Sequence, residues 1–209
     1  MIGIMTAMRE ELQALLDQLE NTESFVKGQR RYFKGVLFGN TVVLVFSRWG
    51  KVAAATTATQ LINDFEITEL IFSGVAGSVK KELSIGDIVV GTELYQHDVN
   101  ASPLFKQFEV PLLGKTYFKT DSKNQQKIYS AAETFTDDFN SKISKKEATN
   151  FSIENPKVIR GAIASGDQFI TNESQINFIN SKLPTVVCVE MEGAAVAQVC
   201  YEYQIPFSI

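Results

Sequence analysis

Residues 185–200 read TVVCVEMEGAAVAQVC. The first part, Thr185–Val189, is apolar and β-branched, which is typical of a strand buried on both faces. The part that follows is rich in alanine and favours a helix, and its small residues Gly193–Ala195 suit close packing. Glu190 and Glu192 fall at the junction between strand and helix. Ligands of open α/β sheets bind beyond the carboxyl ends of strands, so this junction is a candidate functional site.

A structural explanation of Glu192 is also open. An acidic residue in the first turn of a helix interacts favourably with the helix dipole and caps free N–H groups. Glu192 alone does not distinguish this role from ligand binding. The binding role is favoured because other polar residues of the chain also fall at the ends of strands.

Composition excludes several classes of protein. The chain has 209 residues, 44% of them hydrophobic and 21% charged, which is enough to bury a single full core. The net charge is −4 and no basic stripe is present, so binding to nucleic acid is not expected. No signal peptide is recognised, and no apolar run reaches the roughly 18 residues of a membrane span.

Acid–base chemistry must fall mainly to carboxylates. The chain has a single histidine, His97, and two cysteines, Cys188 and Cys200, which do not form a CxxC pair. This argues against a metal site, a disulfide framework and a Ser-His-Asp triad, and we expect no cofactor. For His97, a structural role is favoured over a catalytic one.

The amino terminus predicts a strand at Met1–Met5 and a helix from Met8 to about Glu20, with Thr6 as its cap. Leucines recur in this helix at the spacing of a core-facing stripe, at positions 12, 15, 16 and 19. At about 100° per residue, Glu10 points away from the stripe, whereas Glu11 lies at its edge and can reach a cleft. A first-turn acid that interacts with the helix dipole is the alternative for Glu11.

Two more strand ends carry candidate residues. Further strands are predicted at 31–38, 41–46, 68–72, 86–95 and 157–164, and helices at 52–65, 122–135 and 174–183. The strand at 68–72 runs into SGVAGS (73–78), whose glycines let a ligand approach the backbone, although the motif is not a P-loop. The strand at 157–164 ends in SGDQFI (165–170), where Phe169 either meets a ligand or packs in the core.

The segment from Gln96 to about Lys119 is long, irregular and apolar, with Pro103, Phe105 and Phe108. So apolar a loop is not expected to remain in water. It covers the site or packs on a second subunit. By contrast, the polar, lysine-rich stretch 136–155 predicts a surface excursion.

The chain resembles the 5′-methylthioadenosine/S-adenosylhomocysteine nucleosidases over essentially its whole length. The resemblance implies an α/β fold of the nucleoside phosphorylase type, with three layers and a mixed, twisted central sheet flanked by helices. The residues that carry it are Ile2–Ile4 with Ala7–Glu11, Gly50–Val52, Ser73–Gly77, Gly86–Val89, Ser165–Ile170 and, most specifically, Val189–Ala194.

The family hydrolyses the N-glycosidic bond of adenine thionucleosides to adenine and a thioribose, in methionine salvage and methyl-cycle recycling. The resemblance implies that Glu11 is the base that activates water. Met191 and Glu192 would hold the ribose hydroxyls. Ile170 would contact the adenine edge through its backbone, and Phe169 would stack on the adenine face.

The remaining site residues are expected around the sugar and its 5′ substituent. Gly77 and Val75 would line the ribose side, Met8 would contact the ribose and alkylthio group, and Glu190 would line the same site. Trp49 stands where the family more often has a smaller aliphatic residue, so it is expected to affect how 5′ substituents fit, with core packing as the alternative. The 96–119 loop would lie near the site of a neighbouring subunit, which implies a cytoplasmic homodimer.

The residue types fit this chemistry independently of the resemblance. Cleavage through an oxocarbenium-like state needs a base for water and an acid for the leaving group, and a carboxylate nearby stabilises the developing positive charge. Hydrolysis is favoured over phosphorolysis because no pair of arginines stands on the early loops to bind phosphate. Arg9 and Arg48 are the only candidates there, and Glu11 would repel an anion.

The resemblance stops short at the carboxyl end. The family continues to an arginine, an aspartate that protonates adenine N7, and a last helix, whereas this sequence ends at Ile209. Asp167 belongs to another motif and does not replace that aspartate. We therefore expect a single nucleosidase domain over residues 1–209 that lacks the end of its C-terminal strand and the last helix. The alternatives are 6-amino-6-deoxyfutalosine cleavage, a phosphorylase, and a nucleoside-binding protein without catalysis.

Overall fold

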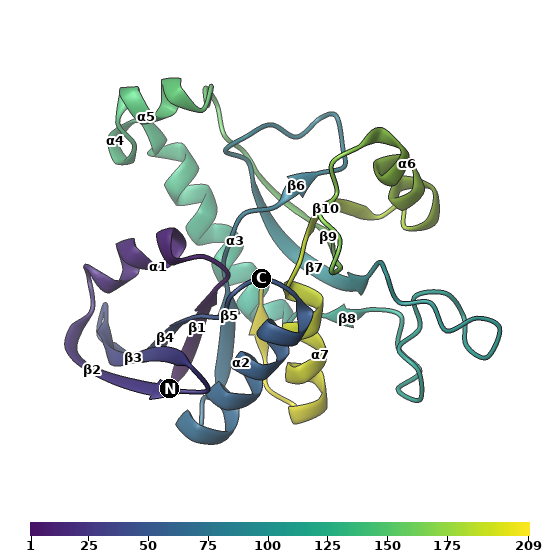
Figure 1. Ribbon diagram of the computed structural model, residues 1–209. Helices are drawn as coiled ribbons and strands as arrows, with labels where there is room; N and C mark the ends of the chain where they lie inside the picture. Colours follow the sequence, from purple (N-terminus) through teal and green to yellow (C-terminus); the bar gives the residue numbers. More distant parts are fainter.

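The computed structural model describes residues 1–209 and contains two sheets (Figure 1). Strand β1 (Ile2–Thr6) lies inside a six-stranded sheet of order β11-β5-β1-β4-β3-β2 and pairs in parallel with both β4 and β5. The other strands of this sheet are β2 (Glu20–Lys27), β3 (Arg30–Leu37), β4 (Asn40–Phe46), β5 (Glu69–Phe72) and β11 (Phe207–Ser208). Strands β2, β3 and β4 form an antiparallel meander.

The second sheet has five strands in the order β6-β10-β9-β7-β8. Its parallel centre is formed by β7 (Ile88–Gln96), β9 (Val158–Ser165) and β10 (Val186–Glu190). Its short antiparallel edges are β6 (Gly77–Ser78) and β8 (Phe118–Lys119). The Gly91 N–H of β7 donates to the Ile209 carbonyl at 2.8 Å, so the two sheets meet beside β11.

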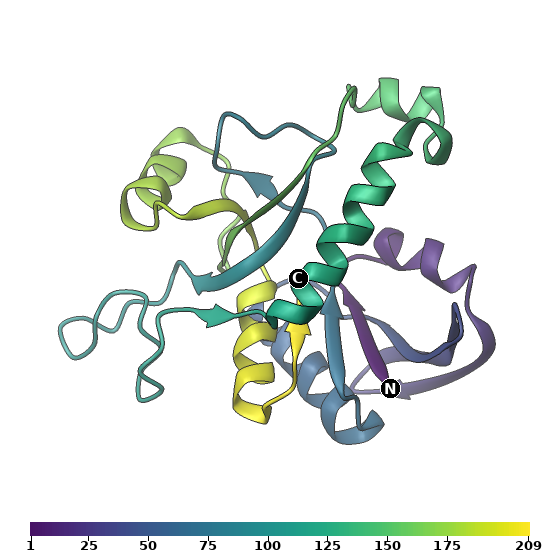
Figure 2. The same ribbon diagram turned by 180° about the vertical axis from the view of Figure 1, so that it is seen from behind.

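Helices cover the sheets on both sides (Figures 1 and 2). Helix α2 (Lys51–Phe65) packs against α7 (Gly193–Tyr203), and α3 (Ser122–Asp137) packs against β7 and β9. The remaining helices are α1 (Arg9–Leu16), α4 (Phe139–Lys142), α5 (Lys145–Asn150) and α6 (Glu173–Lys182). This arrangement confirms the predicted α/β fold of mixed sheets flanked by helices.

Small side chains let α2 and α7 approach one another closely. Ala54 and Ala58 of α2 and Ala194 and Ala197 of α7 are fully buried in the main core. Alanine side chains add little bulk between two helices, so the backbones come close and the packing is dense.

The helix predicted from Met8 to about Glu20 is wrong beyond Leu16. It ends at Leu16, and residues Glu20–Lys27 form the edge strand β2. Most of β2 is exposed, so its sequence ENTESFVK lacks the apolar alternation that marks a half-buried strand. The predicted polar excursion at 136–155 contains the short helices α4 and α5.

The apolar loop between β7 and β8 extends away from the body of the chain (Figures 1 and 2). Leu104 and Leu112 are 85% and 93% exposed at this loop, whereas Phe108 is buried. None of the helices in the structure combines the length and the apolar character needed to span a membrane.

Candidate active site

A pocket of about 310 Å³ opens where strands from both sheets end. Ala7 and Met8 follow β1, Val75 follows β5, Phe169 follows β9 and Met191 follows β10. All of these elements present their carboxyl ends to the pocket. The placement agrees with the rule that ligand sites of α/β sheets lie outside the carboxyl ends of strands.

The ten residues predicted for the site all line this one pocket. They are Met8, Glu11, Trp49, Val75, Gly77, Phe169, Ile170, Glu190, Met191 and Glu192. Four further residues complete the lining, namely Ala7, Ala76, Gln168 and Val189. Each of these four is adjacent in sequence to a predicted residue, so the same strand ends could have indicated them.

The Glu11 carboxylate is held by main-chain N–H groups from two loops. Its Oε2 accepts hydrogen bonds from the N–H groups of Ala7 and Met8, both at 2.9 Å. Its Oε1 accepts from the Val75 N–H at 3.1 Å. Glu11, rather than the predicted Thr6, therefore caps this end of α1, because the Thr6 hydroxyl donates to the Met8 carbonyl instead. Glu10 is exposed, as its position on the helix predicts.

Glu192 is buried and makes a different kind of contact. Its Oε1 accepts a hydrogen bond from the Gly50 N–H at 2.6 Å, although Gly50 lies 142 positions away in the sequence. Glu192 is the N-cap residue of α7, yet its side chain makes no capping hydrogen bond to that helix. Of the structural explanation of Glu192, the capping part is therefore wrong.

The neighbouring Glu190 caps α7 instead. Its Oε2 accepts from the N–H groups of Glu192 and Gly193, at 2.8 Å and 2.7 Å. Its Oε1 accepts from the Ser165 hydroxyl of β9, and the Ser165 oxygen accepts the Ala194 N–H at 2.6 Å. Both oxygens of Glu190 are thus occupied by groups of the protein that fasten β9, β10 and α7 together.

Burial changes the acidity of both carboxylates at this junction. Burial raises the pKa of Glu192 to about 7, the Gly50 N–H opposes this rise, and the negative charges of Glu190 and Glu11 add to it. Burial also raises the pKa of Glu190, against the hydrogen bonds from the Ser165 hydroxyl and the Gly193 N–H. Glu192 therefore changes between its neutral and its ionised form within the physiological pH range.

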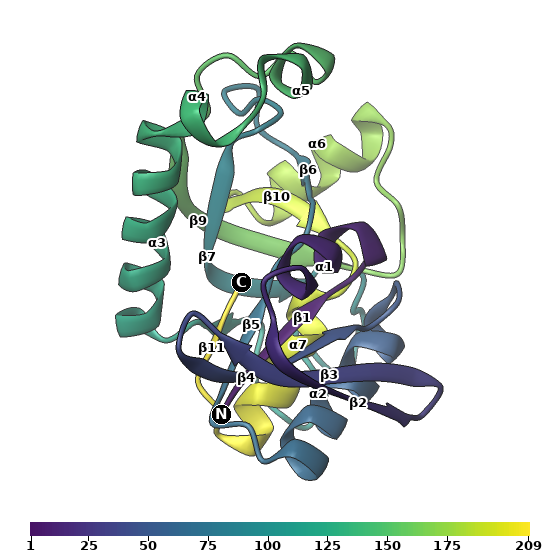
Figure 3. The same ribbon diagram turned by 90° about the vertical axis from the view of Figure 1, so that its left-hand side faces the viewer.

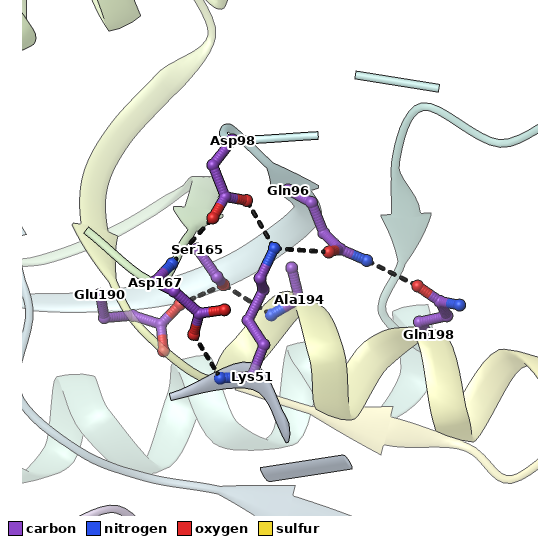
Figure 4. Close-up of polar contacts among 8 residues, drawn as sticks. All are labelled: Lys51, Gln96, Asp98, Ser165, Asp167, Glu190, Ala194 and Gln198. Carbon is purple, nitrogen blue, oxygen red and sulfur yellow. Dashed lines mark hydrogen bonds and ion pairs between the residues drawn. The ribbon is translucent and has the colours of Figure 1, made fainter. Parts of the chain in front are cut away.

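A lysine-centred network ties three loops of the site together (Figure 4). The Lys51 Nζ donates to Asp98 at 2.5 Å and to the Gln96 side-chain oxygen at 3.1 Å. The second Asp98 oxygen accepts the Asp167 N–H at 2.8 Å, and Asp167 accepts the Lys51 N–H at 2.9 Å. This network of hydrogen bonds holds the turn after β9, which bears Phe169, against the amino terminus of α2.

The rim of the pocket is apolar and open. Phe169 is 72% exposed and Trp49 is 63% exposed, so neither packs in the core, which was the alternative explanation for both. Large apolar side chains exposed together at a pocket mouth mark a surface that a ligand or partner covers.

His97 lies outside this pocket. It is buried, burial lowers its pKa, and its Nε2 has no hydrogen-bond partner. Its ring packs on Gly166, where a Cβ would meet the His97 Nε2 at 2.5 Å. No group of three or more His, Cys, Asp and Glu side chains converges in a way that could hold a metal ion.

Comparison with known proteins defines the class first. A family model described as the phosphorylase superfamily matches residues 1–209. A 5′-methylthioadenosine/S-adenosylhomocysteine nucleosidase of Bacillus cereus (strain B4264) is 35% identical over 209 residues, which cover 100% of this chain and 82% of the relative. The chain belongs to the phosphorylase superfamily and, within it, to the family of the 5′-methylthioadenosine/S-adenosylhomocysteine nucleosidases.

Solved structures agree with this assignment. The nucleosidase of Neisseria meningitidis in complex with methylthio-immucillin-A superposes with a TM-score of 0.87 at 32% identity, over 100% of this chain and 82% of that one. A futalosine hydrolase mutant of Helicobacter pylori strain 26695 has a TM-score of 0.78 at 31% identity, over 99% of this chain and 86% of that one.

Proposed function

We propose that this chain hydrolyses the N-glycosidic bond of 5′-methylthioadenosine and S-adenosylhomocysteine, releasing adenine and the thioribose. One observation carries the proposal: Glu11 and Glu192, which come from opposite ends of the sequence, line the same pocket of about 310 Å³. A glycosidic bond that breaks through a cationic sugar needs a base for water and carboxylate charge close by. The reaction would serve methionine salvage and methyl-cycle recycling in the cytoplasm.

Glu11 is proposed as the general base. A carboxylate has about four lone-pair positions, and three of them accept main-chain N–H groups, so one remains for a water molecule. The three hydrogen bonds fix the direction of that remaining position. A water molecule bound in that position is oriented toward the sugar, and Glu11 accepts its proton as it attacks.

Glu192 and Met191 are proposed to bind the ribose. Glu192 receives one hydrogen bond from the protein, from Gly50, so it retains capacity to accept the 2′- and 3′-hydroxyls. Hydrogen bonds to a charged acceptor are each worth about 1.5–3 kcal/mol, which makes this the main anchor of the sugar. Val75, in the loop after β5, and Gly77, the first residue of β6, also line the pocket.

The apolar part of the pocket suits adenine and the 5′ substituent. The exposed Phe169 ring is available to stack on the base, and the adjacent Ile170 backbone is available to its edge. Met8 and Trp49 supply apolar surface for the alkylthio group. Glu190 lines the same pocket, but its occupied oxygens favour a supporting role over direct substrate binding.

Hydrolysis is favoured over phosphorolysis. No arginine or lysine lines the pocket, so a phosphate ion would meet three carboxylates and no cation. Arg9 and Arg48, the two candidates from the sequence, line a separate groove.

A homodimer is proposed from the 96–119 loop. Leu104 and Leu112 lie almost fully exposed on it, and Trp49 and Phe169 are exposed at the pocket mouth. A second copy of the chain that covers these side chains would remove apolar surface from water and close the pocket.

Cleavage of 6-amino-6-deoxyfutalosine is a second candidate. The similarity to a futalosine hydrolase mutant supports it, and the open rim leaves room for a larger 5′ substituent.

The test is release of adenine from each substrate, with and without phosphate, by residues 1–209 and by any form that continues past Ile209. Phosphate-independent release that Glu11→Gln abolishes and Glu10→Gln preserves is expected. Binding of methylthioadenosine without release by either form would favour a binding protein, and release that requires phosphate would overturn the hydrolytic proposal.

A further inference from the structure

A second groove of about 440 Å³ lies between α1 and the β2–β3 hairpin. Leu12 and Leu16 of α1 form one wall, and Val26 and Phe33 form the other. Figure 3 shows α1 lying above β2 and β3 on this side of the molecule. The groove shares no lining residue with the active-site pocket, so it is a separate site.

Arginines are concentrated at this groove. The chain has five, at positions 9, 30, 31, 48 and 160, and the first four line the groove. No carboxylate lines it. All ion pairs of the structure use lysines, so none of these arginines is paired with an acid. In a chain of net charge −4, this is a local excess of positive charge that the protein itself does not neutralise.

Three of the four guanidinium groups keep free donors. Arg30 is the most engaged, since each of its three nitrogens donates to a carbonyl, that of Gly28 at 3.0 Å, of Ser47 at 3.1 Å and of Ala53 at 3.5 Å. Arg48 donates to the Gln29 carbonyl at 2.8 Å, while Arg9 and Arg31 make no side-chain hydrogen bond. A guanidinium has five N–H donors, so Arg9, Arg31 and Arg48 retain most of their capacity.

The floor of the groove is apolar and partly aromatic. Phe33 and Phe46 are only partly buried, and Val26 is exposed. The Arg9 guanidinium carbon lies 5.7 Å from the centre of the Phe46 ring, which places a cation over an aromatic face. A ligand that fits here has an anionic end for the arginines and a flat apolar body for the floor.

We propose that this groove binds a small phosphate monoester with a planar apolar body. Guanidinium groups match phosphate oxygens with paired N–H donors and also stack on flat ring systems, so the same three arginines serve both parts of the ligand. A volume of about 440 Å³ lies in the usual range for small-molecule sites, which combine an apolar lining with a few polar groups. The proposal is independent of the proposed nucleosidase function.

The experiment is isothermal titration calorimetry with 1-naphthyl phosphate, which has the required chemistry but no adenine. The protein is kept saturated with adenine so that the active-site pocket is occupied. Wild type is expected to bind one equivalent, and Arg31→Gln to bind about tenfold more weakly. The triple variant Arg9→Gln, Arg31→Gln, Arg48→Gln is expected to show no binding.

Matched controls separate the groove from general charge. Arg160→Gln removes the one arginine outside the groove and is expected to leave the Kd within about twofold, since exposed charges beyond a Debye length are screened. Inorganic phosphate and 1-naphthol, each half of the probe, are expected to bind at least about tenfold more weakly than the whole. Far-UV circular dichroism checks that every variant is folded.

Three results would overturn the proposal. The first is no heat with wild type, and the second is an equal loss of affinity in Arg31→Gln and Arg160→Gln. The third is binding of an acidic hexaglutamate peptide but not of 1-naphthyl phosphate, which would assign the groove to a protein partner. A lack of adenine binding would count against the nucleosidase function alone, because the arginine variants still report on the groove.

Discussion

The β1–α1 and β10–α7 junctions both place a glutamate in the pocket, but they hold it differently. At β1–α1, one residue does two things, because Glu11 caps its own helix and faces the pocket. At β10–α7 the two tasks are divided. Glu190 caps the helix, and Glu192 is left with a single hydrogen bond from the distant Gly50.

The surroundings of each carboxylate set its chemistry. Glu11 is fixed by three N–H groups and has one direction left for a water molecule. Glu192 is buried with one N–H group, its pKa is raised to about 7, and it has more capacity for ligand hydroxyls. The first arrangement suits orientation of a nucleophile, and the second suits binding of a diol.

The largest effect is expected from Glu11→Gln. An amide keeps the shape of the side chain but removes the base, and general base catalysis contributes roughly 10²–10⁴-fold. We expect kcat/KM for methylthioadenosine to fall about 1,000-fold while the Kd of adenine stays unchanged. A decrease in kcat/KM of less than tenfold would show that Glu11, at the β1–α1 junction, is not the base. Glu10→Gln, the exposed neighbour, is the control.

The next effect is expected from Glu192→Gln. Replacement of the charged acceptor weakens two ribose hydrogen bonds, so we expect kcat/KM to fall about 100-fold, mostly through a higher KM. Steady-state kinetics with methylthioadenosine measure it. An unchanged KM would remove Glu192 from the ribose site.

The pH dependence of activity and stability is expected to depend on Glu192. The ionised form is the better acceptor, so wild-type kcat/KM should rise with pH to a plateau above about 7, and Glu192→Gln should lose this dependence. The free energy of unfolding changes with pH in the opposite direction. A pKa raised in the folded state means that the free energy of unfolding falls as pH rises from 4.5 to about 7, more so in wild type than in Glu192→Gln.

Glu190→Ala should affect stability more than chemistry. The change leaves the N–H groups of Glu192 and Gly193 without an acceptor, which costs about 1–3 kcal/mol of unfolding free energy. Urea denaturation measures the loss, and Glu10→Ala, in the first turn of α1, is the control with an expected change within about 0.5 kcal/mol. Equal stability of the two variants would contradict the division of tasks at β10–α7.

The smallest effect is expected from Trp49→Ile. Trp49 lies at the pocket rim, 63% exposed, so it should affect the 5′ substituent and not the reacting bond. We expect the ratio of kcat/KM for methylthioadenosine to that for S-adenosylhomocysteine to change about threefold. An unchanged ratio would remove Trp49 from the specificity of the site.

Most of the fold and the site membership could be predicted from the sequence. Buried parallel strands are apolar runs, and the residues that follow each run meet at one edge, which makes Glu192 a candidate ligand residue. The family resemblance then predicts that Glu11, Phe169 and Glu192 share one pocket. The structure brings them together.

The exceptions depend on tertiary contacts. Strand β2 was not predicted because it is an exposed edge strand without an apolar pattern. Its first residue also depends on a contact with a distant glycine, since a Cβ at Gly35 would lie 2.5 Å from the Glu20 carbonyl. The exchange of roles between Glu190 and Glu192 depends on Ser165 and Gly50, which only the folded chain brings near. No spacing within residues 185–200 could have shown it.

Gly50 limits how this protein could be engineered. It is the N-cap residue of α2, with φ at 93° and no side chain to cap the helix, so a design protocol would replace it with serine or aspartate to gain stability. Here the new side chain would be strained at that φ, and its Cβ would lie 3.1 Å from an Asp167 oxygen. Rotating the backbone to relieve the strain would turn the Gly50 amide away from Glu192, so a substitution that improves the helix would disturb the proposed ribose site.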